Sequence, residues 1–145
     1  LADDMLKTTY DAPGIGLAAP QVGVLTRLIV LDCVKAEGEK TRHLFLCYPV
    51  CFVSSDETNV YEEGCLSIPE LFADVTRPAE VEVRWMDENG VERTEGMDGL
   101  WATCVQHEID HLEGKLFIDY LKPLKRQMMT RKMVKYKREK AREKA

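Results

Sequence analysis

The feature that most constrains this chain is a pair of histidines in the sequence His-Glu-Ile-Asp-His, residues 107–111. The motif lies within residues 100–112, where apolar residues recur at helical spacing. In a helix, four residues turn about 400° and rise about 6 Å, so His107 and His111 point from one face toward a single cation. Glu108 lies near that face, where it can accept a proton from a water activated by the metal. The motif predicts metal-assisted hydrolysis; the alternative is a core helix whose histidines are only hydrogen-bonded.

The flanking residues support the helix. Asp98 is a suitable N-cap, and Gly114 suits the position just after a helix ends. Because apolar residues lie on several sides, we expect the helix to be buried at the centre of its domain.

A catalytic centre of this type usually has three protein ligands and one open position, so a third ligand is needed. One protease pattern places another histidine where this chain has Phe117, and another uses a later glutamate, but Glu139 and Glu143 lie in a basic tail. His43 lies in a segment with no other ligand signal. The third ligand is therefore expected among the cysteines.

The chain has five cysteines, Cys33, Cys47, Cys51, Cys65 and Cys104. Cys104 precedes His107 by three residues on the same helical face, but that position equally suits a pocket wall or a core residue. Cys65 follows Gly64 and two carboxylates, which indicates an unusual loop or strand end where backbone can approach closely. We therefore favour Cys65.

Three segments together resemble a known family. Residues 14–21 (Gly-Ile-Gly-Leu-Ala-Ala-Pro-Gln), 63–67 (Glu-Gly-Cys-Leu-Ser) and 106–114 are similar, in order, to the three motifs of the peptide deformylases. The similarity continues through residues 76–78, 98–100 and 116–119, so it covers nearly the whole chain.

The resemblance implies a metal-dependent hydrolase that removes the formyl group from the N-terminal formylmethionine of newly made polypeptides and releases formate. It implies one divalent metal held by Cys65, His107 and His111, with Fe2+ the usual native ion and Zn2+, Ni2+ or Co2+ able to occupy the site. It further implies that Glu108 transfers the proton, while Gln21 and the backbone N–H of Leu66 stabilise the oxyanion. The substrate-binding residues it implies are Ile15, Gly16, Glu63, Gly64, Arg77, Leu100 and Cys104. Of these, Glu63 and Arg77 are expected to pair, and Ile15, Leu100 and Cys104 to line the methionine pocket.

The predicted fold class is α+β, with antiparallel sheets packed around the central helix and a C-terminal helix after them. Segments 28–32, 44–53 and 79–87 are rich in β-branched and aromatic residues and are predicted strands. A hairpin turn at 88–90 leads to another strand through about residue 95. Residues 47–49, Cys-Tyr-Pro, replace the family's Ile-Asn-Pro, which we expect to affect local packing more than chemistry.

Length and composition fit one domain. A chain of 145 residues with 45% hydrophobic content can build one core, predicted as a catalytic domain over 1–121. No apolar run approaches a membrane span and no signal peptide is recognisable, so a cytoplasmic location is expected, with an organelle origin as the alternative.

The sequence begins within a helical pattern. Because similar deformylases carry a further N-terminal segment, we expect a fragment or a shortened form.

The C-terminal segment 122–145 has a different charge from the rest. It holds 11 Lys or Arg against two Glu, whereas the preceding residues hold 9 against 23. Its apolar residues could hold a helix on the core as far as about Lys135. The tail is either a solvated, partly frayed helix or a contact to ribosomal RNA, since Lys and Arg bind phosphates with little sequence demand.

Two other function classes remain open. A metallopeptidase would share the histidine motif, although the missing third His or Glu ligand argues against it. A non-catalytic protein, in which the metal site supports the fold or binds the ribosome, is the other alternative if an N-terminal segment is required for activity.

Overall fold

The structure, a computed structural model, describes residues 2–11, 15–24, 26–33, 44–65 and 68–143. The elements within these ranges are α1 (Ala2–Asp11), β1 (Gly16–Ala18), η1 (Ala19–Val22), β2 (Leu28–Leu31), β3 (Leu44–Ser54), β4 (Thr58–Cys65), β5 (Ile68–Pro78), β6 (Glu80–Met86), β7 (Glu92–Asp98), α2 (Gly99–Leu112), η2 (Phe117–Tyr120) and α3 (Pro123–Glu143), where η marks a 3-10 helix.

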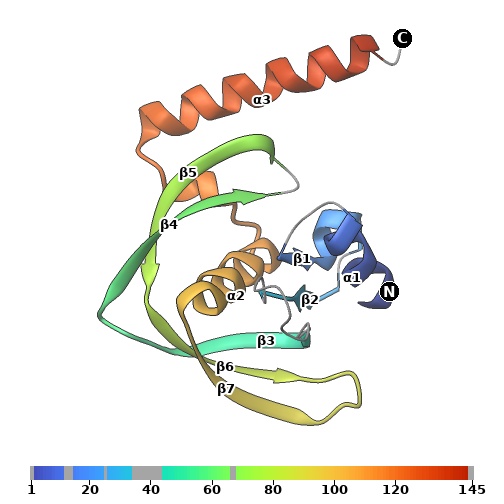
Figure 1. Cartoon of the computed structure of the whole chain (residues 1–145), viewed down its shortest axis with the longest axis vertical. Coiled ribbons are helices and arrows are strands. Elements are labelled where there is room, and N and C mark those ends of the chain that lie inside the picture. The colour runs from blue at the N-terminus through green and yellow to red at the C-terminus, as the bar shows by residue number, and fades with distance from the viewer. Residues whose placement is uncertain (1, 12–14, 25, 34–43, 66–67, 144–145) are drawn as a thin grey trace, which may run out of the picture.

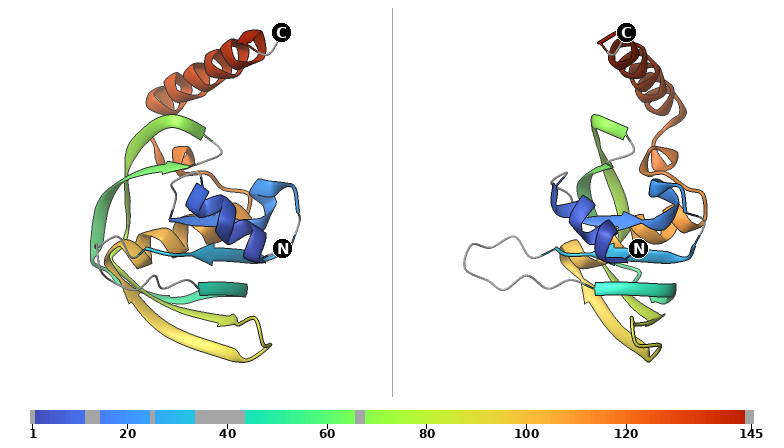
Figure 2. Two further views of the ribbon diagram at one scale, coloured as in Figure 1. Left: turned by 45° about the vertical axis from the view of Figure 1, so that its right-hand side comes forward. Right: turned by 90° about the vertical axis from the view of Figure 1, so that its right-hand side faces the viewer.

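Two antiparallel sheets surround α2 (Figure 1). The larger has the strand order β1-β2-β3-β6-β7, and β4 and β5 form a separate two-stranded ribbon. The two views in Figure 2 show α1 on the side of β1 and β2, while α3 extends from the end of the molecule where the β4–β5 ribbon lies. This arrangement confirms the predicted α+β class with a central helix and a C-terminal helix.

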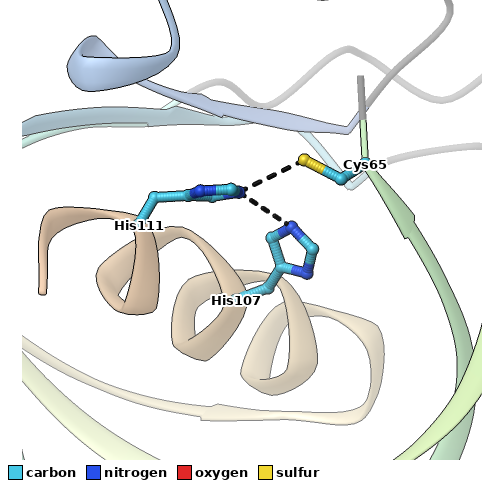
Figure 3. Close-up of side chains that lie close together, drawn as sticks. All are labelled: Cys65, His107 and His111. Atoms are coloured by element: carbon cyan, nitrogen blue, oxygen red, sulfur yellow. Dashed lines mark hydrogen bonds between the residues drawn. The ribbon is translucent and has the colours of Figure 1, made fainter. Parts of the chain in front are cut away.

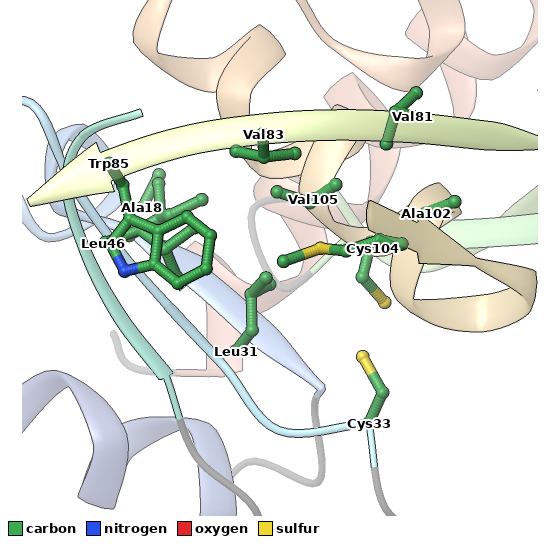
Figure 4. Close-up of a cluster of buried hydrophobic side chains, with 12 residues drawn as sticks. Ala18, Leu31, Cys33, Leu46, Val81, Val83, Trp85, Ala102, Cys104 and Val105 are labelled. Carbon is green, nitrogen blue, oxygen red and sulfur yellow. The ribbon is translucent and has the colours of Figure 1, made fainter. Parts of the chain in front are cut away.

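The main core lies between α2 and the larger sheet (Figure 4). Val81, Val83 and Trp85 point inward from β6 while the residues between them are exposed, as the alternation predicts. Ala102 and Val105 of α2 pack in the same cluster. The core therefore fixes the helix that carries the histidine motif.

The predicted strands at 28–32, 44–53 and 79–87 correspond to β2, β3 and β6, and the strand after the hairpin corresponds to β7. The sequence did not predict β5. Its inward positions include Ala73, Val75 and the charged Arg77, whereas the large apolar Phe72 is exposed. The apolar alternation that identifies a half-buried strand is therefore interrupted in β5.

The family departure at 47–49 falls on an irregular part of β3. Tyr48 has a φ of 50° and is 62% exposed. The pairing of β3 with β6 shifts register between Cys47 and Val50. The substitution thus lies at a break in the regular pairing of β3 with β6.

The C-terminal helix packs on the core only in its first half. Met129 is its only buried residue within the described ranges, Met133 is partly buried in the same cluster, and mostly exposed helix continues beyond Lys135 to Glu143. The last turns of α3 extend away from the sheets (Figure 1). Among the described residues, no helix is long and apolar enough to span a membrane.

Candidate metal centre and active site

Three candidate ligands lie together at the centre of the molecule (Figure 3). Cys65 ends β4, and His107 and His111 lie one turn apart on α2. His111 Nε2 lies 3.2 Å from Cys65 Sγ and 3.2 Å from His107 Nε2. The donor atoms of all three residues lie within 4.8 Å of one another. This spacing is compatible with one ion bound by one sulfur and two nitrogens.

The β4–β5 ribbon brings Cys65 to the histidines by a close backbone approach. At Gly64 an added Cβ would lie 2.5 Å from the ring of Phe72 on the paired strand, so only glycine fits without rearrangement. The strand register shifts between Gly64 and Cys65. This local irregularity turns the end of β4 toward α2, as a glycine in a strand often indicates.

Glu108 lies beside the three donors and is buried. Its Oε1 is 3.9 Å from His107 Nε2, and its Oε2 has no hydrogen-bond partner among the described residues. Burial raises the pKa of Glu108 to about 7, although the charges of His107 and His111 oppose this. A carboxyl group with a pKa near neutrality beside a metal site is suited to accepting and returning a proton.

Gly16 of β1 packs directly against Glu108. An added Cβ at Gly16 would lie 3.0 Å from Glu108 Cγ and 2.9 Å from Leu31 Cδ2. The absence of a side chain therefore lets β1 pass close to the carboxyl group and limits where that group can lie.

Gly16→Ala should displace Glu108 and lower kcat by about 10–100-fold, because small misplacements of a catalytic group have effects of that order. Metal content should stay unchanged, since the substitution does not touch the three donors. Gly96→Ala is the matched control, because an added Cβ there meets nothing within 4 Å. Equal kcat for the two variants would contradict this role for Gly16.

A buried network of charges supports His107. Arg77 donates to both oxygens of Glu63, at 2.7 and 2.9 Å, and both side chains are 4% exposed. Glu63 Oε1 in turn lies 2.9 Å from His107 Nδ1. The predicted pairing of Glu63 with Arg77 is present, and it is buried rather than exposed. A carboxylate on Nδ1 fixes the orientation of the ring and leaves Nε2 directed at the candidate site.

Both ionisable partners in this contact have shifted pKa values. Burial alone would raise the pKa of Glu63, but hydrogen bonds from His107 and Arg77 lower it. Burial alone would lower the pKa of His107, but hydrogen bonds with Cys65 and Glu63 raise it to about 10. A metal that binds Nε2 of His107 must therefore displace a proton held in the metal-free protein.

The stability of the metal-free protein should fall as pH rises from about 5 to 9. The folded-state pKa values of His107 and Glu108 both lie above the ordinary values of these groups, 6.5 and 4.5. Folded protein therefore binds more protons than unfolded protein, and these protons stabilise the folded state at low pH. The stabilisation is lost as pH rises through 4.5–7 for Glu108 and through 6.5–10 for His107. We expect the free energy of unfolding to fall by at least about 2 kcal/mol across this range.

Chelator-treated protein unfolded in urea at each pH measures this effect. Glu108→Gln is the control, because glutamine does not titrate. In this variant the free energy of unfolding should fall less between about pH 5 and 7 than in the wild type. A stability that stays flat or rises over this range would contradict the assigned shifts.

Gln21 lies next to the candidate ligands. Its Oε1 accepts a hydrogen bond from the backbone N–H of Ala18 at 2.8 Å, and this orients Nε2 toward Cys65 Sγ at 3.2 Å. The predicted oxyanion donor therefore has its amide in a fixed orientation at the site. The other predicted donor, Leu66, lies outside the described residues.

The predicted pocket residues belong to the main core. Ile15 and Leu100 are partly buried against it, and Cys104 is 5% exposed within it. The thiol of Cys104 points toward that of Cys33 (Figure 4). A hydrogen bond with Cys33, together with burial, raises the pKa of Cys104. Cys104 is thus a neutral thiol on the helix that carries the histidines.

The sequence did not predict roles for Asp110 and Tyr120. Asp110 Oδ2 accepts hydrogen bonds from Arg77 at 2.8 Å and from the Tyr120 hydroxyl at 2.6 Å. The one available signal was an acidic residue on a helix that the sequence predicts to be buried, which suggests a buried partner. Its partners could not be identified from the sequence, because Arg77 is 33 residues away.

Comparisons with known proteins agree with this geometry. The family model described as "Polypeptide deformylase" matches residues 1–127. A protein of Rhizobium meliloti named "Peptide deformylase" is 57% identical over 135 residues, which are 93% of this chain and 77% of the relative. A protein of that name from Rhizorhabdus wittichii is 53% identical over 143 residues, 95% of this chain and 80% of the relative.

Solved structures are also similar. A peptide deformylase from Legionella pneumophila is 46% identical with a TM-score of 0.86, over 97% of this chain and 80% of that one. A peptide deformylase from Ehrlichia chaffeensis, in complex with actinonin, is 38% identical with a TM-score of 0.87, over 94% and 81% of the two chains. By sequence, fold and the arrangement of its candidate metal site, this chain belongs to the peptide deformylase family.

Proposed function

We propose that Cys65, His107 and His111 hold one divalent metal, and that Glu108 is the proton-transfer group of the site. As a member of the peptide deformylase family, the chain is a metal-dependent hydrolase that removes the formyl group from an N-terminal formylmethionine. The observation that carries the residue assignment is the convergence of the three donors within 4.8 Å. Glu108 lies beside them with a buried carboxylate oxygen that has no hydrogen-bond partner among the described residues.

The donor set fits a first-row transition metal. A thiolate and two imidazoles suit iron, zinc, nickel and cobalt better than magnesium or calcium, which prefer oxygen ligands. Ferrous iron is the proposed native ion, and Zn2+, Ni2+ or Co2+ are proposed to occupy the site in purified protein. When bound, the metal supplies Lewis-acid chemistry, which favours ionisation of water and polarises the formyl carbonyl.

Glu108 accepts a proton from the attacking water and later gives it to the departing amine. Water adds to the formyl carbon, the C–N bond breaks, and the products are formate and a free N-terminus. A pKa of about 7 makes both directions of proton transfer accessible near neutral pH. Its burial keeps this proton from exchanging freely with solvent.

Gln21 and the backbone N–H of Leu66 are the proposed oxyanion donors. The side chain of Gln21 is held by Ala18 and needs little reorganisation to donate to the formyl oxygen. Donors fixed in advance stabilise developing charge more effectively than donors that must be ordered during the reaction.

The proposed methionine pocket is lined by Ile15, Leu100 and Cys104. An unbranched methionine side chain suits apolar walls of this kind. Gly16 and Gly64 are also proposed to contact the substrate through their backbone, and the buried pair of Glu63 and Arg77 is proposed to brace the binding site.

The choice of substrate separates this proposal from a metallopeptidase. The metal-loaded protein should release formate from an N-formylmethionyl tripeptide and leave the same peptide without its formyl group uncut. Cleavage of an internal amide bond in the unblocked peptide, with no formate released from the blocked one, would favour the metallopeptidase instead.

We also propose that the enzyme works in the cytoplasm and that α3 holds it on ribosomal RNA near emerging chains. Among the described residues of α3 only Met129 is buried, so its basic side chains are displayed on a helix that extends from the domain. Basic side chains bind nucleic acid by releasing counterions from phosphates.

Deletion of residues 135–145 should weaken ribosome binding and flatten its dependence on salt, because fewer phosphates are then neutralised. Co-sedimentation at several salt concentrations measures both quantities. A variant that keeps the full length but replaces Lys137, Arg138 and Lys140 with glutamine controls for loss of the helix itself. Unchanged binding of the deletion variant, with no dependence on salt, would contradict the proposal.

A further inference from the structure

The short helix η2 contacts the surroundings of His107 at two points. Phe117, at its start, is 1% exposed and stacks on the His107 ring, with 6.1 Å between centroids and 22° between planes. Tyr120, at its end, contacts the buried charge network through Asp110, which accepts its hydrogen bond. One 3-10 turn therefore holds the candidate ligand directly through Phe117 and indirectly through Tyr120.

Tyr120 closes the outer side of this network. Its hydroxyl donates to Asp110 Oδ2 at 2.6 Å, and the Arg77 guanidinium lies over its ring, 4.6 Å from the centroid. Arg77 is 4% exposed, whereas Tyr120 is 45% exposed. Tyr120 is thus the outermost member of the network and separates Arg77 from solvent while holding the anion that Arg77 binds.

The contacts of Arg77 continue inward to the candidate ligand. The opposite side of its guanidinium is held by both oxygens of Glu63, and Glu63 accepts from His107 Nδ1 at 2.9 Å. With Nδ1 donating to Glu63, Nε2 is the nitrogen left to bind a metal once its proton is displaced, and it lies 3.2 Å from His111 Nε2. The tautomer and direction of His107 therefore depend on how firmly Arg77 holds Glu63.

We propose that Tyr120 is a positioning residue of the metal site, because it fixes Asp110 and Arg77 and thereby the carboxylate of Glu63 that orients His107. This inference rests on the metal centre proposed above. Without the hydroxyl, the side chain of Asp110, which is 16% exposed, keeps only its hydrogen bond from Arg77 and is less firmly held against solvent. Without the ring, water reaches the guanidinium and competes for its donors.

The ionisation state of Tyr120 agrees with this arrangement. Burial and the hydrogen bond to Asp110 raise the pKa of Tyr120, so the phenol stays neutral and keeps its O–H donor at physiological pH. The hydroxyl can therefore serve Asp110 throughout the range in which the metal is bound.

The test is metal affinity rather than turnover alone. Tyr120→Phe removes the hydroxyl and keeps the ring, and Tyr120→Leu removes both. We expect the dissociation constant for Zn2+, measured by chelator competition, to rise about 10–100-fold in Tyr120→Leu, the usual effect of losing a group that supports a metal ligand, and about 3–10-fold in Tyr120→Phe, which keeps the ring over Arg77. The visible spectrum of the Co2+-loaded protein should change in the same order, because His107 is less firmly oriented.

Tyr136→Phe is the matched control, since Tyr136 lies on α3 and its ring contacts Lys140 rather than the network. It should match the wild type in Zn2+ affinity and Co2+ spectrum. In an Asp110→Asn background, the further effect of Tyr120→Phe should be smaller than in the wild type, because the two residues act through one hydrogen bond. Thermal unfolding of each metal-free variant separates a general loss of stability from a loss of metal affinity.

Wild-type Zn2+ affinity and an unchanged Co2+ spectrum in both Tyr120 variants would overturn the role of Tyr120 and leave the metal centre standing. Wild-type protein that binds no Zn2+ or Co2+ would overturn the metal centre itself, and the role of Tyr120 with it. If Tyr120→Phe changed the Zn2+ dissociation constant by the same factor in the wild-type and Asp110→Asn backgrounds, Tyr120 would not act through Asp110, and the proposal would also be overturned.

Discussion

Glu108→Ala is expected to lower kcat by about 10²–10⁴-fold, the usual contribution of a general acid–base group, while metal content stays at about one ion per chain. The reason is geometric. Glu108 lies beside the three candidate ligands without belonging to the group that they form. Its pKa of about 7 and its buried position suit proton transfer rather than a structural ion pair.

Two further variants make this prediction specific. His107→Ala should lose both metal and turnover, because it removes one of the three donors. Glu108→Gln should keep the metal and unfold at the same temperature as the wild type or higher, because it removes a carboxyl group whose burial is unfavourable to its charge. Metal analysis, kcat and melting temperature are measured on each protein. Equal loss of metal in the Glu108 and His107 variants would contradict the separation of roles.

Arg77→Met is expected to lower the free energy of unfolding by about 3–5 kcal/mol, because it leaves a buried carboxylate without its partner. Arg77 is 4% exposed and binds two carboxylates, those of Glu63 and Asp110. Methionine has a similar length but cannot neutralise either one. Since Glu63 also holds His107, metal affinity should fall in the same variant.

Arg84→Met is the matched control for this prediction. Arg84 pairs with Glu92 at 3.2 Å, but the two side chains are 55% and 66% exposed, so loss of the pair should change stability by less than about 1 kcal/mol. Urea unfolding of both variants makes the comparison. Similar losses for Arg77 and Arg84 would show that the buried network contributes no more than a surface ion pair.

The sequence predicted those parts of the fold that depend on local periodicity. The helix with His107 and His111 was predicted from apolar spacing and the flanking Asp98 and Gly114, and α2 spans Gly99–Leu112 with Gly114 at a φ of 78°. Asp98 has extended backbone at the N-cap but makes no side-chain capping hydrogen bond, so its place was predicted correctly and its capping contact was not.

Parts of the fold and site that depend on distant contacts could not be predicted. Strand β5 was missed because it places Arg77 inward and Phe72 outward, against the usual pattern. The inward Arg77 is explained by Asp110 and Glu63, which come from two other elements. When the partners of a buried charge are distant in the sequence, the residues around that charge give no indication that it is buried. The contacts of Tyr120 could not be predicted for the same reason.

Cys65 was an intermediate case. Its setting after Gly64 and two carboxylates distinguished it from the other cysteines, and the structure places its sulfur 3.2 Å from His111. The setting alone did not show that β4 would meet α2 there. The family resemblance supplied that expectation, and the paired strands β4 and β5 give its physical basis.

Formate release from formyl-Met-Ala-Ser by protein loaded with ferrous iron under anaerobic conditions, measured together with metal content, tests the deformylase activity and the metal site at once. We predict rapid formate release with about one metal ion per chain, and loss of both when the metal is removed by a chelator. A protein that holds its full complement of metal and releases no formate would instead have a non-catalytic metal site.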